Sequence, residues 1–80
     1  MRYKATLGSE EIVKKNILTK REKEVFDLLI VNNTTLEIAK SLNISEKTVR
    51  NHISNVMQKL NVKSRAVAVV ELLKMDEISL

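Results

Sequence analysis

The sequence has no cysteine, no proline and a single glycine among its 80 residues. Without cysteine, the chain cannot form a disulfide, a thiolate metal site or a cysteine nucleophile. One histidine is too few for a histidine-rich metal site, and the lone glycine, Gly8, excludes a glycine-rich phosphate-binding loop. We therefore expect no metal, no cofactor, no small-molecule ligand and no catalytic residues, so an enzyme is the least favoured class of protein.

Long apolar runs and aromatic residues are also scarce. The longest uninterrupted apolar stretch, residues 66–70, is far shorter than a membrane-spanning helix, and no apolar segment follows Met1 as in a signal peptide. Of the two aromatic residues, Phe26 is expected in the core, and Tyr3 alone cannot form a platform for stacking bases. With 44% hydrophobic residues, the chain is expected to be a small cytoplasmic domain with one modest core and no membrane partner.

The positive charge is concentrated in one part of the chain. The net charge is +4, and residues 40–65 carry six basic side chains against one acidic side chain, that of Glu46. A local basic patch of this kind attracts a polyphosphate partner such as nucleic acid. On charge alone, an ordinary solvated helix face is the better explanation, so DNA binding has to be argued from the pattern of residues.

Start and stop signals predict four helices, at about 20–31, 35–42, 46–60 and 65–75. Each begins after a residue whose side-chain oxygen can cap a helix, and three end at an asparagine, which tolerates the left-handed conformation. The caps are Thr19, Thr34, Ser45 and Ser64, the first two in capping boxes with Glu22 and Glu37, and the closing asparagines are Asn32, Asn43 and Asn61.

These signals predict an all-α fold in two segments. Residues 18–80 are expected to form the folded domain. Residues 1–17 carry only weak helix signals, and we expect them to be an N-terminal extension that is flexible or lightly docked.

The second and third predicted helices are joined by only three residues, 43–45. So short a connection makes the two helices cross steeply, as in a helix-turn-helix. Ala39 is small where the helices would touch, Asn43 occupies the turn position that needs a positive φ, and Val49 points back into the crossing. The spacing therefore predicts a helix-turn-helix unit.

The predicted helix over residues 46–60 has two contrasting faces. Its apolar residues gather on one side, and the opposite side is polar and cationic, with Glu46 at the helix start as its only acid. An ordinary solvent face mixes acids with lysines, so we favour DNA reading over that alternative. Arginine can pair with guanine and asparagine with adenine in the major groove. The expected base-contacting residues are Lys47, Arg50, Asn51 and Ser54.

A second set of residues is expected to contact DNA phosphates. Lysines suit this role, and the amides that open the helix at Thr34 and Thr35 could hold a phosphate, although plain caps need no DNA. His52 lies at the rim of the apolar face, where a half-buried position is favoured over a base contact. The predicted set is Thr34, Thr35, Thr48, His52, Asn55, Gln58, Lys59 and Lys63.

The last predicted helix has more apolar residues than one buried face needs. One stripe, which includes Ala68 and Leu72, can cover the core, and a second would face water in a monomer. A central position in the core is the alternative, but the polar residues Asp76 and Glu77 after the helix argue against it. We therefore expect a homodimer, with an interface formed by Ala66, Val67, Val70 and Leu73.

Three runs of residues form a combined pattern across residues 18–75. They are Leu18-Thr19-x-Arg21-Glu22-x-Glu24-Val25, Glu37-Ile38-Ala39-x-x-Leu42-x-Ile44-Ser45-x-x-Thr48-Val49-x-x-His52 and Lys59-Leu60-x-Val62-x-x-Arg65. This pattern resembles the LuxR/FixJ-type helix-turn-helix family. The resemblance implies a four-helix LuxR-type DNA-binding domain that dimerises through its last helix and reads double-stranded, pseudo-palindromic DNA with its third.

Within that family, residues 45–55, 57–60 and 69–73 are especially similar to a stand-alone sporulation regulator. This resemblance implies a sequence-specific transcription regulator of late sporulation genes, in particular spore-coat genes, with RNA polymerase as a further candidate partner. In many relatives, glycine stands where this chain has its three helix-closing asparagines, which is a mild conformational departure.

Three alternatives remain open. The chain could be an effector domain excised from a two-domain response regulator, a sigma-factor region-4-like promoter-binding module, or a helical protein-interaction adaptor that never touches nucleic acid. The segment Arg50-Asn51-His52-Ile53 and the apolar last helix favour the regulator over the sigma-factor module. The acid-poor third helix argues against the adaptor.

Overall fold

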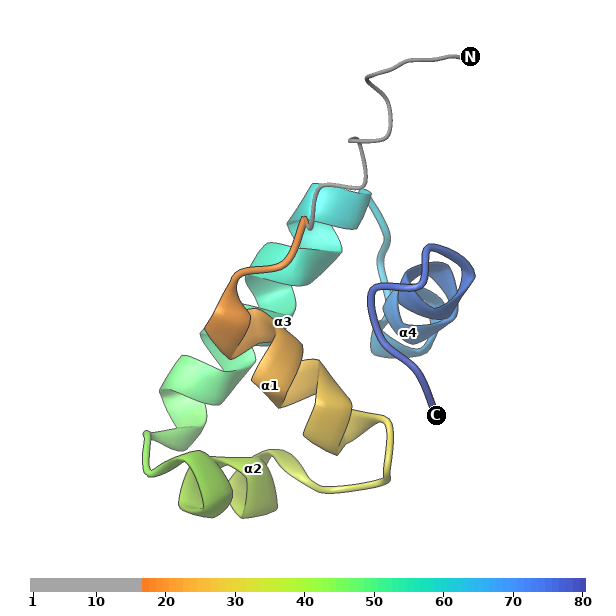
Figure 1. Cartoon of the computed structure of the whole chain (residues 1–80). Helices are drawn as coiled ribbons and strands as arrows, with labels where there is room; N and C mark the ends of the chain where they lie inside the picture. Colours follow the sequence, from red (N-terminus) through yellow and green to blue (C-terminus); the bar gives the residue numbers. More distant parts are fainter. Residues whose placement is uncertain (1–16) are drawn as a thin grey trace, which may run out of the picture.

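The computed structural model describes residues 17–80, and in that range the chain forms four helices and no strand. They are α1 (Lys20–Leu29), α2 (Thr35–Leu42), α3 (Glu46–Leu60) and α4 (Arg65–Lys74). The other three helices all pack against α3, the longest; α2 lies near its N-terminal end, and α4 follows its C-terminal end and lies on the right of Figure 1. The all-α prediction is confirmed, and the helix bounds agree with the predicted ones to within two residues.

All four predicted N-caps are present. The two capping boxes are complete: the side chains of Thr19 and Thr34 accept hydrogen bonds from the third backbone N–H of their helices, and Glu22 and Glu37 accept from the cap N–H groups. At the other two helices, the side-chain oxygens of Ser45 and Ser64 accept from the N–H groups of Thr48 and Val67. Side chains therefore satisfy N–H groups at every helix start that would otherwise lack a partner.

The predicted left-handed asparagines are confirmed as well. Asn32, Asn43 and Asn61 have φ values of 73°, 58° and 56°. A fourth residue, Asp76, has a φ of 59° and turns the chain after α4 in the same way. Asparagine and aspartate are the non-glycine residues best suited to this conformation, because their short polar side chains bond locally.

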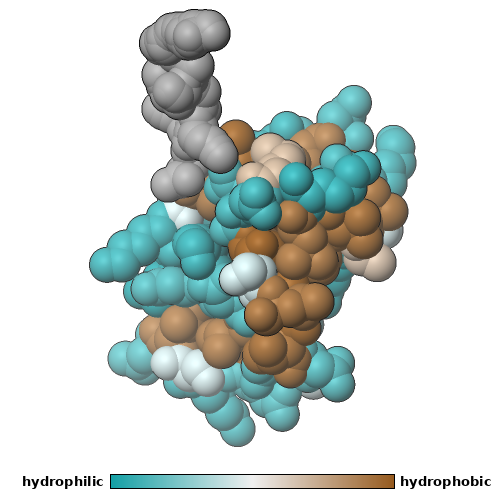
Figure 2. Space-filling view, turned by 45° about the vertical axis from the view of Figure 1, so that its right-hand side comes forward, coloured by the Kyte–Doolittle hydropathy of each residue, from teal (hydrophilic) through white to brown (hydrophobic). Residues whose placement is uncertain are grey.

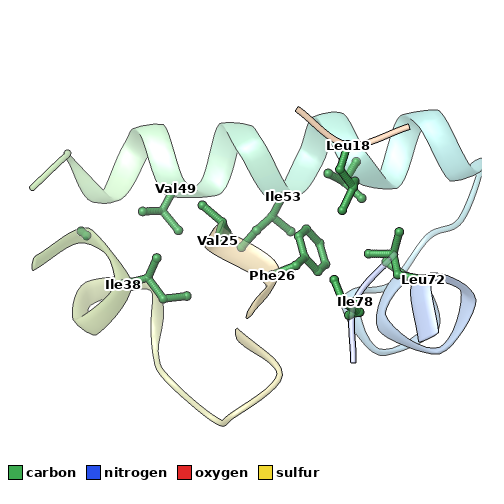
Figure 3. Close-up of a cluster of buried hydrophobic side chains, with 11 residues drawn as sticks. Leu18, Val25, Phe26, Ile38, Val49, Ile53, Leu72 and Ile78 are labelled. Atoms are coloured by element: carbon green, nitrogen blue, oxygen red, sulfur yellow. The ribbon is translucent and has the colours of Figure 1, made fainter. Parts of the chain in front are cut away.

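The core lies between α3 and the three helices packed on it. Phe26 of α1 is fully buried, as predicted, and Figure 3 shows its ring between Ile53 of α3 and the pair formed by Leu72 of α4 and Ile78. Ile38 of α2 occupies the far end of the same cluster, on the side of Val49 (Figure 3). This continuous apolar layer fixes the orientation of α3 relative to its neighbours.

The segment after α4 is not the polar tail that the sequence suggests. Ile78 is only 3% exposed and belongs to the core cluster. The left-handed turn at Asp76 reverses the chain and brings Ile78 back towards Leu72 (Figure 3). One isolated apolar residue beyond a helix has no periodicity, so the helical pattern could not reveal its burial.

At the other end, the predicted N-terminal extension lies outside the described residues except for Ile17, which is half-buried. Leu18, the next residue, is buried in the core cluster. Among residues 17–80, no helix has both the length and the apolar character needed to cross a membrane.

Candidate nucleic-acid interface

The turn between α2 and α3 holds the two helices in a fixed arrangement. Asn43 is left-handed, and the N–H of Ile44 donates to the carbonyl of Ala39 at 3.0 Å. Ala39 and Val49 are both buried where the helices meet. The predicted helix-turn-helix is therefore present, and α3 cannot rotate on α2 without breaking the turn and the apolar contact.

The outer face of α3 is polar and accessible. All four residues predicted to contact bases are exposed, and so are Asn55 and Gln58, two of the three α3 residues among the exposed predicted phosphate contacts; the third, Lys59, lies at the C-terminal end of the helix. The apolar side of the same helix is turned into the core, as Figure 3 shows for Val49 and Ile53. The exposed residues of this face, which is named the DNA-facing surface after the contacts predicted from the sequence, are Lys47, Arg50, Asn51, Ser54, Asn55 and Gln58.

Glu46 has a role that the sequence did not reveal. Its Oε2 atom accepts a hydrogen bond from Nη2 of Arg50 at 2.9 Å and another from Oγ1 of Thr35 at 2.6 Å. The carboxylate thus links α2 to α3 and holds a side chain of the DNA-facing surface. The ion pair with Arg50 did have a signal in the sequence, because an acid four residues before an arginine on one helix is the favourable order for such a pair. The contact with Thr35 had none.

The three threonines predicted to contact phosphates already have hydrogen-bond partners within the domain. Thr35 is buried and its hydroxyl donates to Glu46, so the phosphate contact predicted at this position would use the backbone N–H. Oγ1 of Thr34 accepts from the N–H of Glu37 at 3.1 Å, and Oγ1 of Thr48 lies 2.9 Å from Oγ of Ser45. The Thr34 hydroxyl therefore takes part in the capping of α2, and the Thr48 hydroxyl bonds to the residue that caps α3.

Lys59 joins the other end of α3 to the start of α1. Its Nζ atom donates to Oε1 of Glu22 at 2.5 Å and to the carbonyl oxygen of Ile17 at 3.0 Å. A phosphate contact is expected of Lys59 from the sequence; in the structure its ammonium group is held by this ion pair, which favours a structural role. No local sequence pattern indicates this pair, because its members lie 37 residues apart.

Glu22 is the buried member of that pair. Burial raises the pKa of its carboxyl, but the hydrogen bonds from Lys59 and from the Thr19 N–H, with the charge of Lys59, outweigh it. The net pKa lies below its ordinary value, so Glu22 is ionised at neutral pH. A buried carboxylate with a cation and a backbone N–H as donors is a satisfied structural group.

The remaining predicted phosphate contacts are His52, on α3, and Lys63, after the C-terminal end of α3. His52 is half-buried, as favoured by its place at the rim of the apolar face. Lys63 is exposed in the connection between α3 and α4, and no ion pair involves it among residues 17–80.

The outer side of α4 is apolar. Val67 and Val70 are 46% and 51% exposed, and Ala66 is exposed next to them, as predicted for an outward stripe. Figure 2 turns the side of the molecule that carries α4 forward and shows a broad apolar surface there. Leu73, assigned to the same stripe, is instead half-buried and packs against the core, so it belongs to the edge of that stripe.

Known proteins resemble this chain closely. The family model described as "Bacterial regulatory proteins, luxR family" matches residues 16–72. "Spore germination protein GerE" of Bacillus subtilis (strain 168) is 65% identical over 74 residues, which is 92% of this chain and 100% of that protein. A solved structure of "Transcription factor, GerE" superposes with a TM-score of 0.79 at 52% identity, covering 81% of this chain and 97% of that one.

In a longer relative, the similarity is confined to one part of the protein. "Transcriptional regulatory protein DegU" of Brevibacillus brevis is 51% identical over 59 residues, which is 74% of this chain but 25% of that protein. The family consists of transcription regulators and is not a family of enzymes. The chain therefore belongs to the luxR family of bacterial regulatory proteins, and it is a DNA-binding transcription regulator.

Proposed function

We propose that this regulator binds pseudo-palindromic DNA as a homodimer in the cytoplasm and controls late sporulation genes, in particular spore-coat genes. The sporulation role is supported by the 65% identity to a spore germination protein along that protein's whole length. The DNA-binding mode rests on one observation, the exposed polar face of α3 directly after a rigid turn. At genes that it activates, the regulator would also contact RNA polymerase.

Base reading is assigned to the middle of the DNA-facing surface. Arg50 and Asn51 supply the donor and acceptor groups that suit guanine and adenine, and Lys47 and Ser54 lie one turn to either side. Phosphate contacts are assigned around them, to Lys63, Asn55, Gln58 and His52 and to the helix starts at Thr34, Thr35 and Thr48. This division follows chemistry and position, because charge without a planar pair of donors carries little sequence information.

The test of base reading compares two duplexes, one enriched by the wild-type protein from a randomised library and one with the same bases scrambled. Replacing Arg50 or Asn51 by alanine should cost about 1–3 kcal/mol on the enriched duplex and much less on the scrambled one. Gln58→Ala, on the same face, is the control and should weaken both duplexes alike. Equal losses on both duplexes for Arg50→Ala and Asn51→Ala would make these residues phosphate contacts.

Dimerisation is assigned to the outer stripe of α4, formed by Ala66, Val67 and Val70 with Leu73 at its edge. A twofold axis through this stripe would place the two α3 helices roughly 34 Å apart, one DNA turn, facing two half-sites. One short helix per subunit buries little area, so the dimer should be weak in solution and strengthened by DNA.

Val70→Glu tests the dimer, because it places a charge on a side chain that is 51% exposed in the single chain. Helix content should be unchanged by circular dichroism, while sedimentation shows less dimer and full-site DNA binding weakens more than half-site binding. Leu36→Glu is the sedimentation control, since Leu36 is equally exposed at 51% but lies on α2. If Val70→Glu changes neither sedimentation nor full-site binding, α4 is not the interface.

A further inference from the structure

Glu46 is the one acidic residue of α3, and it stands at the end of the helix that faces α2 and begins the DNA-facing surface. A carboxylate next to DNA repels every phosphate, whatever the base sequence, so it weakens binding to all DNA alike. The start of a helix favours an acid, but that preference explains neither of the two hydrogen bonds that Glu46 accepts from other side chains.

Those two hydrogen bonds converge on one oxygen atom. Oε2 of Glu46 accepts from the Thr35 hydroxyl at 2.6 Å and from Nη2 of Arg50 at 2.9 Å. Thr35 is buried at the start of α2, so the donor that fixes Glu46 is itself fixed by the fold. The result is a chain of contacts that runs from a buried hydroxyl, through a half-buried carboxylate, to an exposed guanidinium group.

The pairing leaves Arg50 able to read DNA. A guanidinium group has five N–H donors, and Glu46 occupies one of them. The others remain available for a bidentate contact with guanine. An arginine without such a partner samples many rotamers and can pair with any nearby phosphate, whereas a held arginine presents its donors in one direction.

We propose that Glu46, anchored by Thr35, is a positioning residue that presets the guanidinium group of Arg50 and so sets the DNA sequence selectivity of the regulator. The carboxylate lowers affinity for DNA in general and raises the contrast between the correct site and other sequences. This inference rests on the proposed function, in which Arg50 reads a base.

Glu46→Gln is the first test, with the enriched and scrambled duplexes described above as probes. Glutamine keeps the shape and can still accept the Thr35 hydrogen bond, but it removes the negative charge that holds Arg50. Binding to the scrambled duplex should become tighter, and the ratio of the two affinities should fall by about five- to tenfold. Asp27→Asn is the matched control, because it removes one charge from an exposed ion pair of the same 2.9 Å length and i,i+4 spacing on α1.

Thr35→Val separates the anchor from the charge. It removes the hydroxyl but leaves the Glu46 carboxylate, so selectivity should fall without tighter binding to the scrambled duplex. Thr35→Ser keeps a hydroxyl at the same position and should restore the wild-type ratio. Circular dichroism of each variant checks that the helices are intact, and Glu46→Gln changes no buried apolar group.

A double mutant distinguishes this inference from the function on which it rests. In an Arg50→Ala background, Glu46→Gln should no longer change the affinity ratio, because there is no guanidinium group to position. If Arg50→Ala lowers selectivity while Glu46→Gln and Thr35→Val leave it at the wild-type value, base reading stands and the positioning role is overturned. If Arg50→Ala itself leaves the ratio unchanged, both are overturned.

Discussion

The two ends of α3 each carry an ion pair, and the pairs differ in burial and in partner. At the C-terminal end, Lys59 bonds to the buried Glu22 and to a backbone carbonyl, both next to the start of α1. At the N-terminal end, Arg50 bonds to Glu46 on the same helix, and more than half of its side chain is exposed.

The difference shows which charges serve the fold and which are available to DNA. A buried carboxylate that loses its cation keeps its desolvation cost without compensation, so the Lys59 pair is needed for stability. An exposed pair within one helix contributes little to stability, and its partners can be exchanged for those of a ligand. The sequence alone predicts that both Lys59 and Arg50 contact DNA. The burial of Glu22 and the greater exposure of Glu46 distinguish the structural role of Lys59 from the DNA-binding role proposed for Arg50.

The largest expected effect is on the buried pair. Glu22→Ala removes a capping-box acceptor and leaves Lys59 without its carboxylate, so we expect the free energy of unfolding to fall by about 2–4 kcal/mol. Glu37→Ala is the matched control, because Glu37 has the same capping-box role on α2 but is exposed. Urea denaturation of both variants measures the difference. Equal losses would mean that the cap alone matters and that the contrast between the two ends of α3 is false.

A smaller effect is expected from pH. The pKa of Glu22 is lower in the folded chain than its ordinary value, so its contribution to stability is complete above the ordinary carboxyl range. That contribution is lost as the pH falls through the lowered folded pKa. The melting temperature of the wild type should therefore fall more steeply towards acid pH than that of Glu22→Gln, because glutamine does not titrate. Parallel curves would contradict an ionised Glu22 in the folded state.

The smallest effect concerns salt. Lys63→Met should lower the slope of log affinity against log salt concentration by about one on every DNA sequence, with little change in stability. Lys59→Met should do the reverse, lowering the unfolding midpoint and leaving the slope unchanged, because its ammonium group is held by α1. If the slope falls equally in both variants, Lys59 contacts DNA phosphates and the prediction for it is wrong.

The fold was predictable from the sequence because its signals are local. Thr19 and Glu22, or Thr34 and Glu37, lie three residues apart, and such spacings are visible without knowing the tertiary structure. The short turn that ends at Ser45 is equally local. Helix starts, helix ends and the exposed side of α3 all follow from patterns of this length.

The departures come from contacts between residues far apart in the chain. Lys59 meets Glu22 across 37 residues, and Thr35 meets Glu46 across 11. The turn at Asp76 brings Ile78 into the core, and no helical periodicity in the sequence predicts that burial. A pattern of charges identifies candidate DNA contacts, but only packing shows which of them another helix already holds.

The left-handed turns have a consequence for the unfolded chain. In residues 17–80, every residue with a positive φ is an asparagine or an aspartate, namely Asn32, Asn43, Asn61 and Asp76. Glycine would adopt the same angles more easily, but it also explores far more conformations before folding. With a Cβ atom at each of these positions, the chain gives up less backbone entropy when it folds. That economy matters in a domain of this size, which buries a smaller share of its surface than a larger one.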